Sequence, residues 1–263
     1  PFALCSYILV SVKIGFQISD LVLILIALVS ARIFGMSINR IFDVNIDKKN
    51  PRTLNRGLIS GSISFRGAYA LALISFLIFY LVIINFNINA LYLSPIVIIL
   101  FLIYPLTKRF TFLCHYFLGL VYLIAPPAVE IALTGRFSTE TLFLGISGFF
   151  WVSGFDLIYA ILDIDFDKEN NIYSIPSKFG IKITKLLASM SHLLTLIFML
   201  SIGLIININP IYWFGCTIII ILFIREHFIL KNITKENINT AFFDMNGQIS
   251  IMFMATFLLS III

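Results

Sequence analysis

Carboxylate side chains recur at helical spacing near the ends of two long apolar segments. Asn39, Asp43 and Asp47 follow one another at intervals of four residues. A helix places such residues on one face, with a drift of about 40° per step. Asp163 and Asp167 have the same spacing at the end of a later apolar segment. The pattern predicts two clusters of oxygen ligands, each on one helical face.

The second cluster extends back along its own segment. Tyr159 and Asp156 lie four and seven residues before Asp163. At about 100° per residue both fall on the face that carries Asp163 and Asp167, whereas Asp165 points about 200° away. We therefore expect one stripe that contains Asp156, Tyr159, Asp163 and Asp167, and we expect Asp165 to lie outside it.

Such stripes are costly unless a ligand neutralises them. Two carboxylates about 6 Å apart repel by roughly 3 kcal/mol at an effective dielectric of 20, and near lipid each would take up a proton. A divalent cation reverses that preference, and Mg²⁺ is usually held by one or two carboxylates together with waters and substrate phosphates. Asp43 and Asp163 are flanked by apolar residues, where acidic side chains are functional by default. A solvated rim is the alternative for Asp47 and Asp165 taken singly.

Basic residues are expected beside both clusters. Lys108 and Arg109 close the apolar segment that contains Tyr104, and Arg52 and Lys178 lie in polar loops. These cations could bind a phosphorylated ligand, although anchoring at the cytoplasmic face explains them equally well.

One arginine and three histidines lie outside these motifs. Arg32 lies inside an apolar helix, seven residues before Asn39, and is expected to pair with an acid or an anionic ligand. His115, His192 and His227 show no ligand spacing and are interpreted as structural.

The elements that carry these residues are predicted to cross a membrane. Of the 263 residues, 60% are hydrophobic and 12% charged, whereas soluble domains carry about 25% charged residues. The mean hydropathy is +1.05. Such a chain needs lipid around it, and the net charge of +5 requires no nucleic-acid partner.

Apolar runs of spanning length predict an all-α polytopic bundle. Residues 1–12 are too short to cross about 30 Å of hydrocarbon, so we expect them to be the end of a truncated first helix. With that segment we predict nine transmembrane helices in a single membrane-embedded domain, 1–263. The other eight runs are 18–44, 67–86, 90–107, 112–134, 141–162, 184–206, 208–224 and 247–263.

The distribution of cations predicts the orientation. Fourteen Lys and Arg residues lie in or beside the polar loops 45–66, 105–111, 163–183 and 225–246, while the opposite turns hold only Lys13 and Arg136. Positive charge favours the cytoplasmic side. Both acidic clusters are therefore expected to face the cytoplasm, as in a bacterial inner membrane.

Three motifs resemble the signatures of the UbiA superfamily of membrane prenyltransferases. Residues 27–64 read ALVSARIFGMSINRIFDVNIDKKNPRTLNRGLISGSIS, which is similar to that family's NxxxDxxxD motif and the Asn-Pro-Arg-Thr loop after it. YPLTKRFT at 104–111 and GFDLIYAILDIDFDKENNIYSIPSKFG at 154–180 resemble its YxxxKR segment and its second, DxxxD motif. AFFDMNGQIS at 241–250 resembles the start of the last helix.

The resemblance implies transfer of a polyprenyl group from its diphosphate to the ring of an aromatic acid. It is closest to 4-hydroxybenzoate polyprenyltransferases of quinone biosynthesis. Asp43 with Asp47, and Asp163 with Asp167, would each hold Mg²⁺, with Asn39 as an auxiliary ligand.

The same resemblance implies roles for the remaining site residues. Arg109 would pair with the acceptor carboxylate. As a hypothesis of our own, a nearby acid such as Asp156 would receive the ring proton. The other expected contacts are to substrate, and their residues are Arg52, Tyr104, Lys108, Tyr159 and Lys178. The lipid bilayer is the expected surrounding, and no obligatory protein partner is expected.

Other functions stay open at this point. Intramembrane acids also mark the pathways of transporters and channels, but here they cluster beside cationic loops that would repel a cation. A scaffold without chemistry would not explain two acidic stripes. Within the family, an acceptor of the haem O synthase, menaquinone or homogentisate type is the alternative.

Overall fold

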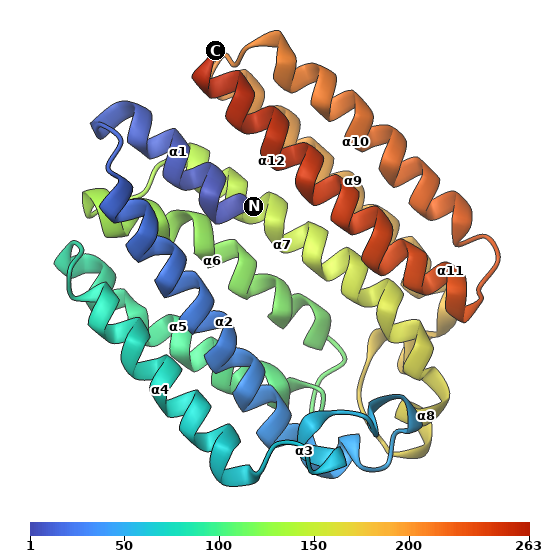
Figure 1. The fold of residues 1–263 in the computed structure, drawn as a ribbon. Coiled ribbons are helices and arrows are strands. Elements are labelled where there is room, and N and C mark those ends of the chain that lie inside the picture. Colours follow the sequence, from blue (N-terminus) through green and yellow to red (C-terminus); the bar gives the residue numbers. More distant parts are fainter.

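The computed structural model describes residues 1–263, apart from the side chain of Ile262. Nine apolar helices form the bundle (Figure 1). Their bounds are α1 Phe2–Ile14, α2 Ile18–Asp47, α4 Phe65–Ile83, α5 Ile88–Thr107, α6 Cys114–Thr134, α7 Thr139–Tyr159, α9 Ile175–Ile205, α10 Pro210–Ile229 and α12 Asn246–Ile262. Shorter turns connect them: η1 Pro51–Thr53, α3 Gly57–Ser60, η2 Ala160–Asp163, α8 Ile164–Glu169, α11 Lys235–Asn239 and the π-helical η3 Thr240–Met245.

Eight segments are long and apolar enough to cross a membrane, and α1 is a shorter apolar helix of 13 residues. The predicted all-α, multi-pass architecture is confirmed. α2 buries Ala27, Ala31, Phe34 and Ile38, which recur at three- and four-residue spacing, against side chains of α4 and α5. Outward-facing residues such as Val29 remain exposed, as lipid-facing positions should.

The helices lie side by side, and α3 and α8 gather at one end of the bundle (Figure 1). α2 packs against α4 and α5, α6 lies between α5 and α7, and α9 packs along α7. The last pair, α10 with α12, completes the other side. The helix ends that carry Asp47 and Asp163 therefore reach the same end of the molecule.

The second acidic segment is not one continuous helix as expected. α7 ends at Tyr159, a tight 3₁₀ turn covers Ala160–Asp163, and α8 begins at Ile164. The expected span 184–206 also begins earlier, because Ser174 and Ser177 form a capping box that starts α9 at Ile175. Gly180, with φ 76° and ψ 174°, breaks that helix near its start, a conformation that glycine adopts without a Cβ penalty.

Helices α6 and α7 approach each other closely through glycine. A Cβ added at Gly145 would lie 2.1 Å from the backbone oxygen of Leu123, and one at Gly119 would lie 2.7 Å from the backbone oxygen of Phe149. Small residues permit such close backbone approach between membrane helices. This contact fixes the position of α7, which carries part of the acidic stripe.

We expect Gly145→Ala to separate α6 from α7 and to lower stability by about 1–3 kcal/mol, as overpacking does. Gly247→Ala is the matched control, because a Cβ there meets nothing within 4 Å. Thermal unfolding of the purified protein in detergent should show a lower midpoint for the first variant and an unchanged or higher one for the control. Equal midpoints would contradict the close approach.

Candidate functional site

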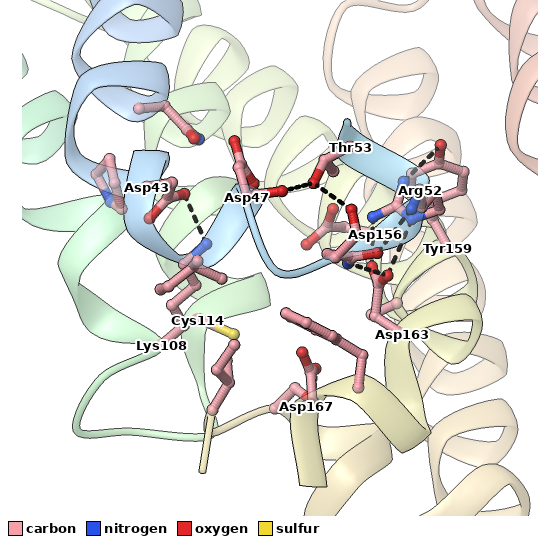
Figure 2. Close-up of a pocket in the computed structure, with 18 of the residues that line it drawn as sticks. Asp43, Asp47, Arg52, Thr53, Lys108, Cys114, Asp156, Tyr159, Asp163 and Asp167 are labelled. Carbon is pink, nitrogen blue, oxygen red and sulfur yellow. Dashed lines mark hydrogen bonds and ion pairs between the residues drawn. The ribbon is translucent and has the colours of Figure 1, made fainter. Parts of the chain in front are cut away.

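A cavity of about 280 Å³ opens at the end of the bundle where the acidic helix ends meet. Its walls come from α2, the loop after α2, α5, the start of α6, and the segment from α7 to α8. Figure 2 shows Asp43 with Lys108 on one side of the cavity and Arg52 with Asp163 on the other. Two segments that are far apart in the sequence thus contribute carboxylates to one space.

Most of the residues singled out from the sequence line this cavity. They are Asn39, Asp43, Asp47, Arg52, Tyr104, Lys108, Asp156, Tyr159, Asp163 and Asp167. Asp165 is exposed and lies outside the lining, so the helical phase correctly separated it from its neighbours even though the helix is interrupted.

Three expected cations lie elsewhere. Arg109 is exposed, and its Nη2 donates a hydrogen bond of 2.6 Å to the backbone oxygen of Phe42. Lys178 places its ammonium group 4.1 Å from the ring centre of Phe112. Arg32 is exposed and, within the described residues, makes no ion pair with an acid, so of the two expected partners only an anionic ligand is left. None of the three lines the cavity.

The first acidic helix end is neutralised by two cations. Lys108 Nζ lies 2.6 Å from Asp43 Oδ2, and Arg56 Nη1 lies 2.5 Å from Asp47 Oδ2. The Asp43 side chain is only 3% exposed, and its other oxygen, Oδ1, is buried without a hydrogen-bond partner in the described structure. A buried carboxylate oxygen in that state is costly. A ligand in the cavity would supply the partner that Asp43 Oδ1 lacks.

The loop after α2 carries the partners of the second acidic segment. Asn50 accepts a hydrogen bond of 2.9 Å from the backbone N–H of Arg52, and Pro51 starts the turn η1, which suits proline at the first helical position. The loop then projects two donors toward Asp163: Asn50 Nδ2 and Arg52 Nε each donate to Asp163 Oδ1 at 2.9 Å.

Arg52 is further fixed by an aromatic neighbour. Its Nη2 forms an ion pair with Asp163, and its Nη1 donates a 3.0 Å hydrogen bond to the hydroxyl of Tyr159. Burial alone would lower the pKa of Arg52, but its hydrogen bonds and attraction to Asp163 outweigh that effect and raise the pKa. The guanidinium is thus a permanent charge that links the loop to the end of α7.

Asp167 has a neutral partner. The hydroxyl of Ser174, the residue that caps α9, donates a 2.7 Å hydrogen bond to Asp167 Oδ2. This carboxylate therefore lacks a Lys or Arg partner among the described residues, and it remains available to a cation that enters the cavity.

Three basic residues that line the cavity, His115, Arg56 and Arg40, were not among the site residues predicted from the sequence. His115 was taken as structural, yet its Nδ1 lies 2.7 Å from Asp156 Oδ2. Arg56 lies in the polar loop 45–66 and Arg40 lies inside an apolar helix, and neither of them was assigned a site role from the sequence. Arg40 makes no hydrogen bond or ion pair within the described residues. Its position directly after Asn39, in an apolar helix, was the available signal.

The balance of charge shows what the cavity can hold. Five carboxylates line it against four Lys and Arg side chains, Arg40, Arg52, Arg56 and Lys108. A polyanionic ligand such as a diphosphate would meet these five carboxylates, and divalent cations that enter with it would offset their charge. Within the described residues, no three His, Cys, Asp or Glu side chains gather into a complete metal site. That donor set fits Mg²⁺, which commonly takes only one or two carboxylates and completes its shell with waters and substrate phosphates.

Sequence comparison places the whole chain in one family. The model of the UbiA prenyltransferase family matches residues 1–257. A protein named 4-hydroxybenzoate octaprenyltransferase from Francisella tularensis subsp. mediasiatica is 30% identical over 226 residues, which cover 86% of this chain and 79% of that protein. The protein of the same name from Pseudoalteromonas translucida is 27% identical, over 86% of this chain and 77% of its own length.

Solved structures share the architecture. An apo UbiA homologue from Aeropyrum pernix K1 superposes with a TM-score of 0.88 at 28% identity, covering 98% of this chain and 96% of that one. A UbiA homologue from Archaeoglobus fulgidus, solved with GPP and Mg²⁺, has the same fold, with a TM-score of 0.69 at 18% identity and coverage of 100% and 96%. This chain belongs to the UbiA prenyltransferase family and is an integral, multi-pass membrane enzyme.

Proposed function

We propose that this protein transfers a polyprenyl group from polyprenyl diphosphate to the ring of an aromatic acid, 4-hydroxybenzoate, in quinone biosynthesis. The observation that carries the proposal is the single cavity in which both acidic helix ends meet their basic partners. The names of the curated relatives support the acceptor, and the Archaeoglobus fulgidus neighbour, solved with GPP and Mg²⁺, supports the donor and the metal.

The acidic pairs would hold Mg²⁺ on both sides of the diphosphate. Asp43 and Asp47 would bind one ion and Asp163 and Asp167 another, with Asn39 as an auxiliary ligand. Bound Mg²⁺ supplies positive charge where negative charge develops on the departing diphosphate. The unpartnered Oδ1 of Asp43 supports the first of these two sites.

The basic side chains have a second role once their carboxylates are engaged. Lys108 and Arg52 now neutralise Asp43 and Asp163. In the loaded enzyme Mg²⁺ would neutralise those carboxylates, and Lys108 and Arg52 would turn to diphosphate oxygens. Arg40, which has no ion pair in the described structure, needs no such exchange.

Ionisation leaves an allylic cation that must be kept from water. The aromatic rings of Tyr104 and Tyr159 line the cavity, and such faces attract cations. Tyr159 is held by Phe242, whose ring stacks on it with centroids 4.0 Å apart. Asp156, at the same cavity, would accept the ring proton after the new carbon–carbon bond forms.

The substrate contacts of Arg109 and Lys178 remain predictions. For Arg109 to bind the acceptor carboxylate in a bidentate manner, its side chain must leave the backbone oxygen of Phe42 and turn inward. Lys178 would likewise have to leave the ring of Phe112 to close over the diphosphate. Arg109→Ala should raise the KM for the aromatic acid; an unchanged KM would reduce Arg109 to an anchor at the membrane surface.

The cavity is proposed to face the cytoplasm of a bacterial inner membrane. The loops that carry fourteen Lys and Arg residues lie at the cavity end, and the positive-inside bias orients such loops inward. Donor and acceptor would then both be collected from the cytoplasmic side.

Removal of a metal-binding carboxylate should abolish transfer. We expect Asp43→Asn and Asp163→Asn to lower kcat on the order of 100-fold or more, since each removes charge that positions the leaving group. Asp165→Asn is the matched control on the same segment, because Asp165 is exposed and outside the cavity. Chelation of Mg²⁺ should stop the wild-type reaction and added Mg²⁺ should restore it. Full activity of the Asp43 and Asp163 variants would refute the metal assignment.

The acceptor is tested with labelled polyprenyl diphosphate and a panel of aromatic acids and phenols. Wild-type enzyme should convert 4-hydroxybenzoate into a lipid-soluble labelled product and should release diphosphate in equal amount. Transfer to homogentisate or a naphthoate instead would keep the prenyltransferase chemistry and correct the acceptor.

A further inference from the structure

The pairing of His115 with Asp156 has a function that the metal and diphosphate sites do not require. We propose that His115 is a positioning residue: it holds Asp156 so that one carboxylate oxygen faces the cavity and accepts the proton of the acceptor ring. This inference rests on the proposed aromatic transfer, and it assigns a role to a histidine that the sequence marked only as structural.

The two residues are brought together by the packing of their helices. His115 lies in the first turn of α6 and Asp156 in the last turn of α7. Because α6 and α7 run antiparallel and touch at Gly119 and Gly145, these two helix ends meet at the cavity. Nδ1 of His115 lies 2.7 Å from Oδ2 of Asp156, a short hydrogen bond of the charge-assisted kind.

The pair is asymmetric in exposure. The side chain of His115 is 5% exposed, whereas that of Asp156 is 24% exposed, and both residues line the cavity. Oδ2 of Asp156 is occupied by the imidazole, and within the described structure Oδ1 has no hydrogen-bond partner. That oxygen is not among the fully buried polar atoms, so it is the one a substrate can reach.

The two ring nitrogens of His115 have different surroundings. Its Nε2 is buried and has no partner among the described residues. With a proton on Nδ1 the imidazole donates to Oδ2 of Asp156, and the buried Nε2 gives the ring no second contact in the described structure.

Asp156 differs from the other acids in the nature of its partner. Lys108 and Arg52 bind Asp43 and Asp163, and Arg56 binds Asp47. The metal assignment uses those three acids and also Asp167, whose partner is the hydroxyl of Ser174. Asp156 is the remaining carboxylate of the cavity, and its Oδ1 is open to a substrate, so Asp156 suits the role of base.

The carbon–oxygen bond to the diphosphate breaks, and the diphosphate leaves with its electron pair. The ring carbon bonds to the allylic carbon, and the ring then carries the positive charge. Oδ1 of Asp156 takes the proton from that ring carbon, and the electron pair of the carbon–hydrogen bond restores aromaticity. His115 stays bound to Oδ2 and holds the carboxyl in place.

A ring isotope effect tests this role. Transfer is measured with ordinary 4-hydroxybenzoate and with 4-hydroxybenzoate deuterated at the two positions beside the hydroxyl. We expect no isotope effect on kcat in the wild type, where loss of the proton follows the slow step. His115→Ala should lower kcat by about 10- to 100-fold, within the range of general-base contributions, and should show a primary isotope effect.

A conservative variant separates positioning from packing. His115→Asn retains an N–H donor close to the place of Nδ1, so it should recover most of kcat and lose the isotope effect. His227→Ala is the matched control, since His227 lies outside the cavity and contacts His192 and Ser189. The His227→Ala enzyme should show no isotope effect, like the wild type. Thermal unfolding in detergent confirms that each variant is folded.

The outcomes are distinct. A folded His115→Ala enzyme that is slow but shows no isotope effect would overturn the proposal, and so would normal kcat in that variant. If His115→Ala does not fold, an isotope effect in His115→Leu, a larger side chain that also lacks an N–H donor, decides in the same way. Failure of the wild type to prenylate any aromatic acid would instead refute the proposed function. Activity of the wild type is therefore measured before the variants are compared.

Discussion

Carboxylates at the edge of a membrane must be matched by positive charge whether or not a ligand is bound. Here the match for Asp43 comes from α5, through Lys108, and the match for Asp163 comes from the loop after α2, through Arg52. Removing one partner of a buried ion pair is strongly destabilising. The same contacts that prepare the cavity for a diphosphate therefore also fasten α2, α5 and α7 at this end of the bundle.

Helix packing sets the remaining geometry. The close approach of α6 and α7 at Gly145 brings the start of one and the end of the other to the cavity. Phe242, in the π-helical turn before α12, stacks on Tyr159 and so ties the C-terminal helices to the cavity wall. A reactive cation needs such a wall, because every gap is a path for water.

Features that depend on one segment could be predicted from the sequence. Apolar length predicted the spans, and helical phase separated exposed Asp165 from Asp163 and Asp167. The break of α7 at Tyr159 was not predicted, since Ala160–Asp163 carries no Gly or Pro to announce a turn.

Features that depend on two segments were harder to predict. His115 and Asp156 lie 41 residues apart, and only the antiparallel packing of α6 and α7 makes them neighbours. Arg109 and Arg56 both lie in polar loops, yet only Arg56 lines the cavity. The two arginines differ in the path that the backbone takes after the preceding helix, α2 for Arg56 and α5 for Arg109. The residue type alone does not predict that path.

The order of the ion-pair partners along the chain has a consequence for biogenesis. Asp43 is made 65 residues before Lys108, whereas Arg52 precedes Asp163 by 111 residues. When Asp43 is synthesised, its counter-ion Lys108 has not yet been made. When Asp163 is synthesised, its counter-ion Arg52 is already present. Until the residues after α5 are inserted, Asp43 lacks this counter-ion, and near lipid it would be held as the neutral acid.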